Sequence, residues 1–267
     1  MKLRIVLLCW LLLAGAPAAQ ASVIGYVPMD DRPVNLEYVE DTVRAAGETI
    51  VTPSVLNIAG RQRPGNVPGL WDWVFEQAAV SDAMALSADS LVYGGLVASR
   101  THFDSDAELS ARLEKFRELK RRYPALRLYV FSTIMRTPKM SAGATEPPYY
   151  EKLGPTIFRI TALEDKREVA GLSAAETAEL SRLIGAVPAE NLADWRTRRA
   201  KNYRINEQLQ QLAREGVFEY LLLGRDDASP LSASHQEARH LQTSGAGMDA
   251  SRYLSIPGAD NLGMSLV

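Results

Sequence analysis

Short apolar runs of strand length alternate with stretches of helical periodicity along most of the chain. The expected strands cover residues 23–29, 49–53, 83–87, 126–131, 218–224 and 252–256. Several of these runs are almost continuously apolar, which is typical of parallel strands buried on both faces. The alternation predicts an α/β fold with a mainly parallel sheet. An incomplete (β/α) barrel is a second architecture that the same pattern allows.

The first 21 residues have the pattern of a secretory signal peptide. Lys2 and Arg4 precede a short apolar core, and Ala19-Gln20-Ala21 is a small-x-small cleavage signal. A membrane anchor is the alternative, but the apolar stretch is short for a bilayer span. We therefore expect cleavage after Ala21, a periplasmic or extracellular location, and no stable membrane span in the mature chain.

Composition narrows the chemistry of the remaining chain. Cys9, the only cysteine, lies in the signal segment, so disulfides, thiolate zinc sites and a cysteine nucleophile are excluded from residues 22–267. The net charge of −2, with acids and bases interspersed, gives no reason to expect a nucleic-acid partner. Residues 22–267 are expected to form a single α/β domain. Because the chain ends inside an apparent helix, that domain is expected to lack its C-terminal part.

Two acidic doublets follow apolar runs directly. Asp30-Asp31 ends the run at 23–29, and Asp226-Asp227 comes after the run at 218–224. Open α/β sheets bind ligands at the carboxyl ends of their strands, so the doublets predict one acidic site built from distant segments. The alternative is that these aspartates are turn and helix-cap residues, for which a doublet is not needed.

Converging carboxylates raise one pKa and leave a neighbour ionised, which is the division of labour used in glycoside hydrolysis. On this interpretation Asp226 and Asp227 supply the acid and the base or nucleophile, and Asp30 and Asp31 complete the site. The expected partner is a small-molecule or glycan substrate, and no cofactor is required. The same oxygens would suit a divalent cation in a metal-dependent hydrolase. A non-catalytic periplasmic ligand-binding protein is the alternative outside the enzymes.

Further side chains are expected around these acids to bind substrate. The arginines among them would pair with the acids or hold a substrate carboxylate or phosphate. The stretch 137–155 is rich in proline and aromatic residues and is interpreted as a binding lid or as a packed surface loop. Residues 89–96 are expected to form a glycine-bearing loop. The expected substrate-binding residues are Arg32, Asp89, Tyr93, Arg100, Arg136, Tyr149, Tyr150, Glu151 and Asp260.

Other catalytic patterns receive little support. The three histidines form no HExxH motif, no GxSxG elbow is present, and the glycine pairs lack the context of a phosphate loop. Arg199, Asn202 and Asn206 share one face of an expected helix from about 192 to 215. That face is interpreted as solvated, with amides directed at a pocket as the alternative.

Several of these segments resemble a known family. The stretch 26–35 (YVPMDDRPVN), the stretch 91–97 with Ser99-Arg100, and 134–136 followed by 149–151 resemble motifs of the bacterial domain-of-unknown-function family 4127. The segments 226–227 and 258–260 are similar to it as well. The likeness runs from about Val23 to the last residue. It implies a longer protein than this chain, and it brings no established activity.

Overall fold

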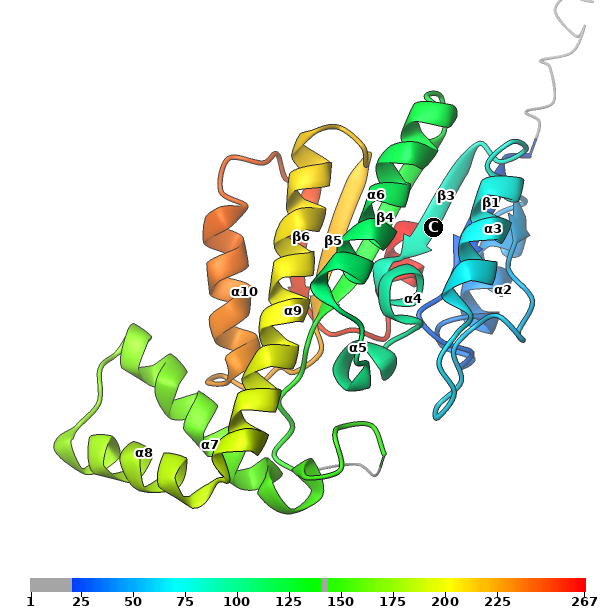
Figure 1. Cartoon of the computed structure of the whole chain (residues 1–267). Helices are drawn as coiled ribbons and strands as arrows, with labels where there is room; N and C mark the ends of the chain where they lie inside the picture. Colours follow the sequence, from blue (N-terminus) through cyan, green and yellow to red (C-terminus); the bar gives the residue numbers. More distant parts are fainter. Residues whose placement is uncertain (1–20, 141–143) are drawn as a thin grey trace, which may run out of the picture.

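The computed structural model describes residues 21–140 and 144–267, which form an all-parallel six-stranded sheet between helices (Figure 1). In sheet order the strands are β2 (Thr49–Val51), β1 (Val23–Val27), β3 (Ala83–Ser87), β4 (Arg127–Ile134), β5 (Tyr220–Arg225) and β6 (Tyr253–Pro257). The helices are α2 (Glu37–Ala45), α3 (Val67–Gln77), α4 (Ala88–Tyr93), α5 (Ala98–Thr101), α6 (Asp106–Arg122), α7 (Tyr150–Val169), α8 (Ala174–Ala186), α9 (Ala189–Arg214), α10 (Ala233–Ser244) and the 3-10 turn η1 (Met264–Leu266). The predicted α/β class is confirmed.

The order of the strands shows an open sheet and not part of a barrel. In a barrel of successive βα units each strand neighbours the next, but here β1 lies between β2 and β3. Val27 pairs with Leu86 on one side, and Gly25 pairs with Val51 on the other. The barrel alternative is therefore wrong. The chain reverses direction across the sheet between β1 and β3, and open α/β sheets bind ligands at such a point.

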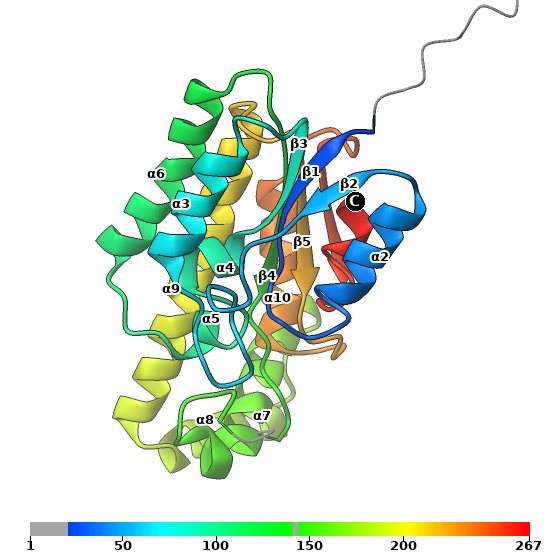
Figure 2. The ribbon, with the colours of Figure 1, turned by 90° about the vertical axis from the view of Figure 1, so that its right-hand side faces the viewer.

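Alternate side chains of the strands enter two separate cores, as the period of two requires. Met84, Leu86 and Leu221 face α3, α6, α9 and α10. Ala85 and Leu222 face α2 and the segment after β6. Figure 2 shows this arrangement, with α3, α6 and α9 on one side of the sheet and α2 with the C-terminal end on the other. The apolar runs of the sequence thus become strands buried on both faces.

A third layer lies beyond the carboxyl ends of the strands, where α7 and α8 pack against the first half of α9 (Figure 1). Its core includes Tyr150, Ile157 and Trp195, with the rings of Tyr150 and Trp195 4.6 Å apart. The expected excursion at 137–155 therefore includes the start of a 20-residue helix. No helical period is visible in that part of the sequence because Gly154 and Pro155 interrupt the apolar pattern.

Two helix starts are present where capping boxes predicted them, and one segment expected to be a loop is a helix. The capping boxes of Ser105 with Glu108 and of Ser173 with Glu176 are both present, at the starts of α6 and α8. The expected loop at 89–96 is instead largely α4, which the Ser87 side chain caps by accepting a hydrogen bond from the Ser90 N–H. That part of the prediction is wrong because the short apolar turn is buried on all sides.

Gly94 and Gly95 end α4 with positive φ angles of 89° and 118°. At Gly95 a Cβ atom would lie 2.4 Å from the Cβ of Ala59, so no larger residue fits without a shift. The Gly65 N–H also donates to the Gly94 carbonyl at 2.7 Å. These two glycines let the loop at 57–66 lie directly against the end of α4.

Candidate active site

One cavity of about 1220 Å³ lies at the carboxyl ends of the strands. Its wall draws on the segments that follow β1, β3, β4, β5 and β6, together with the loop at 59–66. The charged side chains that line it are Asp30, Arg32, Arg61, Arg63, Arg100, Asp104, Arg112, Arg136, Glu146, Arg198, Asp226 and Asp260. The cavity thus joins acidic residues that are up to 230 positions apart in the sequence.

Asp30 is held at the end of β1 by donors on its own segment. Its carboxylate accepts hydrogen bonds from the Arg32 guanidinium at 2.9–3.0 Å and from the Asn35 amide at 2.6 Å. The Nη2 atom of Arg32 also donates to Asp260 at 2.8 Å, and the Asp260 side chain remains 59% exposed. Arg32 therefore bridges the strand ends of β1 and β6 across the sheet.

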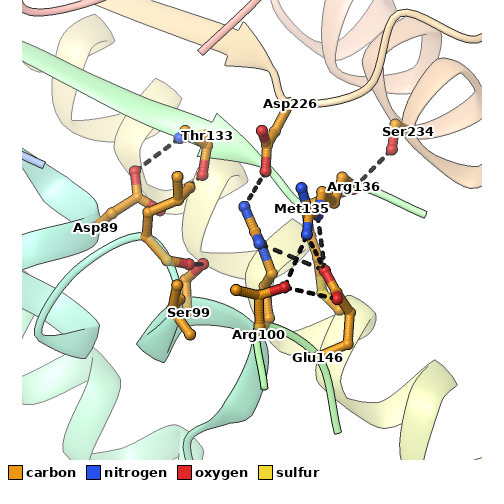
Figure 3. Close-up of polar contacts among 12 residues, drawn as sticks. Asp89, Ser99, Arg100, Thr133, Met135, Arg136, Glu146, Asp226 and Ser234 are labelled. Atoms are coloured by element: carbon orange, nitrogen blue, oxygen red, sulfur yellow. Dashed lines mark hydrogen bonds and ion pairs between the residues drawn. The ribbon is translucent and has the colours of Figure 1, made fainter. Parts of the chain in front are cut away.

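Asp226 leaves the end of β5 and points at Arg100, which comes from α5 (Figure 3). Arg100 is 3% exposed and also lies 3.5 Å from Glu146, whose side chain is fully buried. Burial raises the pKa of Asp226, while the positive charges of Arg100 and Arg136 oppose this shift. The negative charge of Asp260 adds to the rise. This environment favours a carboxyl group that holds its proton at higher pH than an exposed aspartate.

Asp89 lies behind the cavity wall and does not line it. Its two carboxylate oxygens accept from the N–H and the hydroxyl of Thr133 at 2.9 and 2.8 Å (Figure 3). Complete burial nevertheless raises its pKa to about 7, and the nearby charge of Asp226 contributes. Asp89 ties the start of α4 to β4 and places a second acid with a raised pKa close to Asp226.

Arg136 follows β4 and lines the cavity with a side chain that is 23% exposed. Its Nε donates to Glu146 at 2.7 Å and its Nη2 to Thr145 at 3.0 Å. Its Nη1 atom has no hydrogen bond to any residue within 21–140 and 144–267. The arginine therefore keeps one donor directed away from its structural partners.

Tyr93 and His102 form an uncharged part of the wall, with ring centroids 4.9 Å apart. Burial lowers the pKa of His102 to about 4, so the ring is neutral at ordinary pH. Neither the Tyr93 hydroxyl nor the His102 ring nitrogens make a hydrogen bond with the described residues. The Tyr93 hydroxyl and both ring nitrogens of His102 are therefore buried polar atoms at the edge of the cavity.

Arg199, Asn202 and Asn206 share one face of α9, as expected, but all three are buried. The interpretation of this face as solvated is therefore wrong. Arg199 donates to the carbonyls of Met135 and Arg136 at 2.9 and 3.0 Å and pairs with Glu237. Asn202 accepts from the Met135 N–H at 3.1 Å, and Asn206 donates to the Thr133 carbonyl at 3.1 Å. These side chains bind the backbone where β4 ends, and they fix the position from which Arg136 enters the cavity.

The second member of each acidic doublet lies outside the cavity lining. Asp31 is exposed beside the loop at Gly60, and Asp227 accepts from the Ser229 N–H at 2.8 Å in a local turn. Asp227 thus shows the turn role that was the alternative for all these aspartates, while Asp30 and Asp226 face the cavity. The structure brings the two doublets together through one residue of each.

The aromatic pair expected to cover the substrate lies in the α7–α9 layer. Tyr150 is fully buried and donates to the Pro138 carbonyl at 2.8 Å, and Tyr149 donates to Asp194 at 2.6 Å. Glu151 is exposed in the first turn of α7. None of the three lines the cavity, so the tyrosine rings present no stacking face to it.

The family model described as protein of unknown function (DUF4127) matches residues 24–267. The chain belongs to the DUF4127 family. The resemblance of its motifs to this family is thereby confirmed, and every aspartate of the cavity lies within the match. No curated protein matches the chain.

Sequence reasoning on this DUF4127 chain missed several residues of the cavity. Glu146 lies between Arg100 and Arg136, inside a stretch for which no regular structure was expected. Arg61 and Arg63 lie between β2 and α3 in a stretch rich in glycine, proline and arginine, and this composition is the only signal that the sequence offers for them. Arg198 donates to the His102 carbonyl at 2.7 Å. In the sequence it is one of five basic residues within 196–204, a composition that is usual on an exposed helix surface.

For this DUF4127 protein a divalent cation was only an alternative occupant of the acidic site, and no stable membrane span was expected. Within residues 21–140 and 144–267, no group of three or more His, Cys, Asp or Glu side chains is arranged to hold a metal ion. No helix in the same ranges is long and apolar enough to cross a membrane. The expected signal peptide covers residues 1–21, and residues 1–20 of it lie outside the described part of the chain.

Proposed function

We propose that this protein is a hydrolase of a carbohydrate or related polyhydroxylated compound, which uses carboxyl groups from separate strand ends as acid and base. The observation that carries the proposal is that Asp30, Asp226 and Asp260 line one cavity at the carboxyl end of the sheet. Pairs of carboxyl groups in contrasting environments are the equipment of glycoside hydrolysis.

The contrasting environments assign the roles. Asp226 has a raised pKa through burial and is the proton donor to the leaving oxygen. Asp260 is exposed and has one oxygen without a partner in the described residues, so it takes the proton from the attacking water. Asp30 already accepts hydrogen bonds from Arg32 and Asn35, and it orients Arg32 toward Asp260. The carbon–oxygen bond breaks as the water oxygen attacks, and the two carboxyl groups exchange their protonation states.

The test measures turnover of a panel of nitrophenyl glycosides by the full chain and its variants. We expect Asp226→Asn and Asp260→Asn to lower kcat by about 100-fold or more, which is the range for loss of a general acid or base. Asp72→Asn is the matched control, since Asp72 is exposed on α3 and outside the cavity. Thermal unfolding of each variant shows whether the fold is retained. Full activity in folded Asp226→Asn would refute the assignment.

The same assay distinguishes the proposed function from the two alternatives, a divalent-metal-dependent hydrolase and a non-catalytic binding protein. Loss of turnover in EDTA, restored by Mg²⁺, Mn²⁺ or Ca²⁺, would replace the proposal with a divalent-metal hydrolase that uses these aspartates. Saturable binding of a glycoside without turnover would favour a periplasmic binding protein. Turnover that is insensitive to EDTA supports the proposal as stated.

We further propose that the protein acts outside the cytoplasm after removal of residues 1–21. The basic start, apolar core and Ala19-Gln20-Ala21 site support this location. Mass spectrometry of the protein from the periplasmic fraction is expected to give Ser22 as the first residue. A cytoplasmic protein that begins at Met1 would contradict this location.

A further inference from the structure

The charge of the cavity differs in sign from that of the whole chain. Seven arginines and five acidic residues line it, whereas the chain as a whole carries a net charge of −2. Basic side chains that gather in a concave site raise the local concentration of anions. Arg198 pairs with Asp194, which lies outside the lining, at 2.7 Å. The excess positive charge that remains has no carboxylate partner among the described residues.

The acidic residues of the cavity already form ion pairs with particular arginines of its wall. Asp226 pairs with Arg100, and Asp30 and Asp260 both pair with Arg32. Asp104 pairs with Arg112 at 2.9 Å. These pairs leave the charges on the loop at 59–66 without a carboxylate to neutralise them.

Arg61 is an arginine of the cavity wall whose guanidinium has no partner among the described residues. It lines the cavity, its side chain is exposed, and no residue within 21–140 and 144–267 forms an ion pair or hydrogen bond with its guanidinium. Arg136, which enters from the end of β4, also keeps its Nη1 atom free of partners in the described chain. Two arginines from different segments of the wall thus have donors available to a ligand.

The turn that carries Arg61 is anchored. Arg63 donates to the carbonyls of Leu56 and Val55, both at 3.0 Å, and the Gly60 N–H donates to the Arg63 carbonyl at 2.9 Å. The Asn66 N–H further donates to the Asn57 carbonyl at 2.9 Å. Because these bonds close the loop on itself, the backbone of Arg61 is held at the wall of the cavity.

We propose that the cavity binds an anionic group of the substrate, a carboxylate or a phosphate, through Arg61 and Arg136. The planar guanidinium presents paired N–H donors that match these two groups, and neutral hydroxyl compounds make no comparable use of a positive charge. This inference rests on the proposed function, and it names the substrate class as an acidic sugar, either a uronate or a sugar phosphate.

The test uses glucuronate, glucose 6-phosphate and glucose as probes, with binding followed by calorimetry at constant ionic strength. We expect at least one acidic sugar to bind 10-fold or more tightly than glucose. Binding of glucuronate alone identifies a carboxylate site, and binding of glucose 6-phosphate alone identifies a phosphate site. Equal binding of glucose and the acidic sugars, or no binding of any probe, would overturn the proposal.

Arg61→Gln is expected to weaken binding of the acidic sugar by 10-fold or more. Arg121→Gln is the matched control, since Arg121 is exposed at the end of α6 and does not line the cavity. Equal affinity in the two variants would overturn the role of Arg61. Since binding is measured without turnover, it is unaffected by failure of the acid/base assignment. Asp226→Asn is expected to bind the acidic sugar while it lacks activity.

Discussion

At the amino-terminal ends of the strands, Arg117 pairs with Glu215 where both side chains remain more than one-third exposed. At the carboxyl-terminal ends, Arg100 lies against Asp226 and Glu146 with almost no contact with water. Exposed pairs contribute about 0–1 kcal/mol, whereas burial of charge carries a large desolvation penalty that its partners only offset. The buried cluster at the cavity is therefore explained better by chemistry than by stability.

The largest expected difference in the free energy of unfolding comes from removing one arginine from each of these two ion-pair regions. Arg100→Gln leaves two buried carboxyl groups without their shared cation and is expected to lower the free energy of unfolding by about 3–5 kcal/mol. Arg117→Gln is expected to lower it by less than about 1 kcal/mol. Urea unfolding of both variants beside the parent chain measures the difference. Similar values would show that water reaches the cavity cluster as freely as the surface pair.

Gly47 and Gly95 allow the two ends of the sheet to be compared by the cost of a glycine-to-alanine substitution. Gly47, which precedes the amino end of β2, has a φ of 85° and open space where a Cβ atom would lie, so Gly47→Ala is expected to destabilise by about 1 kcal/mol. Gly95, beside the cavity wall, has both a φ of 118° and the close contact with Ala59. Gly95→Ala is expected to destabilise by about 2–4 kcal/mol, since overpacking adds to the strain. Thermal unfolding of the two variants measures the difference, and a smaller loss for Gly95→Ala would contradict it.

The buried Asp89 behind the cavity wall makes the stability of the fold depend on pH. The pKa of Asp89 rises from 3.8 to about 7 on folding, so between these values the folded chain retains a proton that the unfolded chain has lost. The stabilising contribution is full below about pH 4 and is lost as the pH rises toward 7. Relative to Asp89→Asn, the parent chain is expected to lose about 2–3 kcal/mol between pH 5 and pH 8, at about 1.36 kcal/mol per pH unit up to the folded pKa. Urea unfolding at both pH values measures this, and parallel pH profiles would contradict it.

The acidic doublets predicted where the site lies but not which aspartate of each pair forms it. Consecutive residues leave a strand end in different directions, so only one of each doublet faces the cavity. Asp30 and Asp226 do so, while Asp227 accepts a hydrogen bond in its turn. The choice depends on how the chain turns after the strand, which a single sequence does not specify.

Other errors came from patterns that two environments share. Arg199, Asn202 and Asn206 have the spacing of one helix face, and that spacing is the same whether the face meets water or the polar ends of a strand. The strands and the longer helices were predictable because their apolar periods follow directly from burial. Glu146 was not predictable because its role depends on arginines 46 and 10 positions away.

A cavity built from the ends of β1, β3, β4, β5 and β6 has a consequence for folding. Its charged groups come together only after strand pairings that close long loops, so a chain that lacks any one of these strands presents an incomplete site. A ligand of this cavity therefore recognises the fully assembled sheet and not its partly folded forms. Its binding would shift the unfolding equilibrium of the whole domain by mass action. Ligand-dependent melting is thus a measure of cooperative assembly across the sheet.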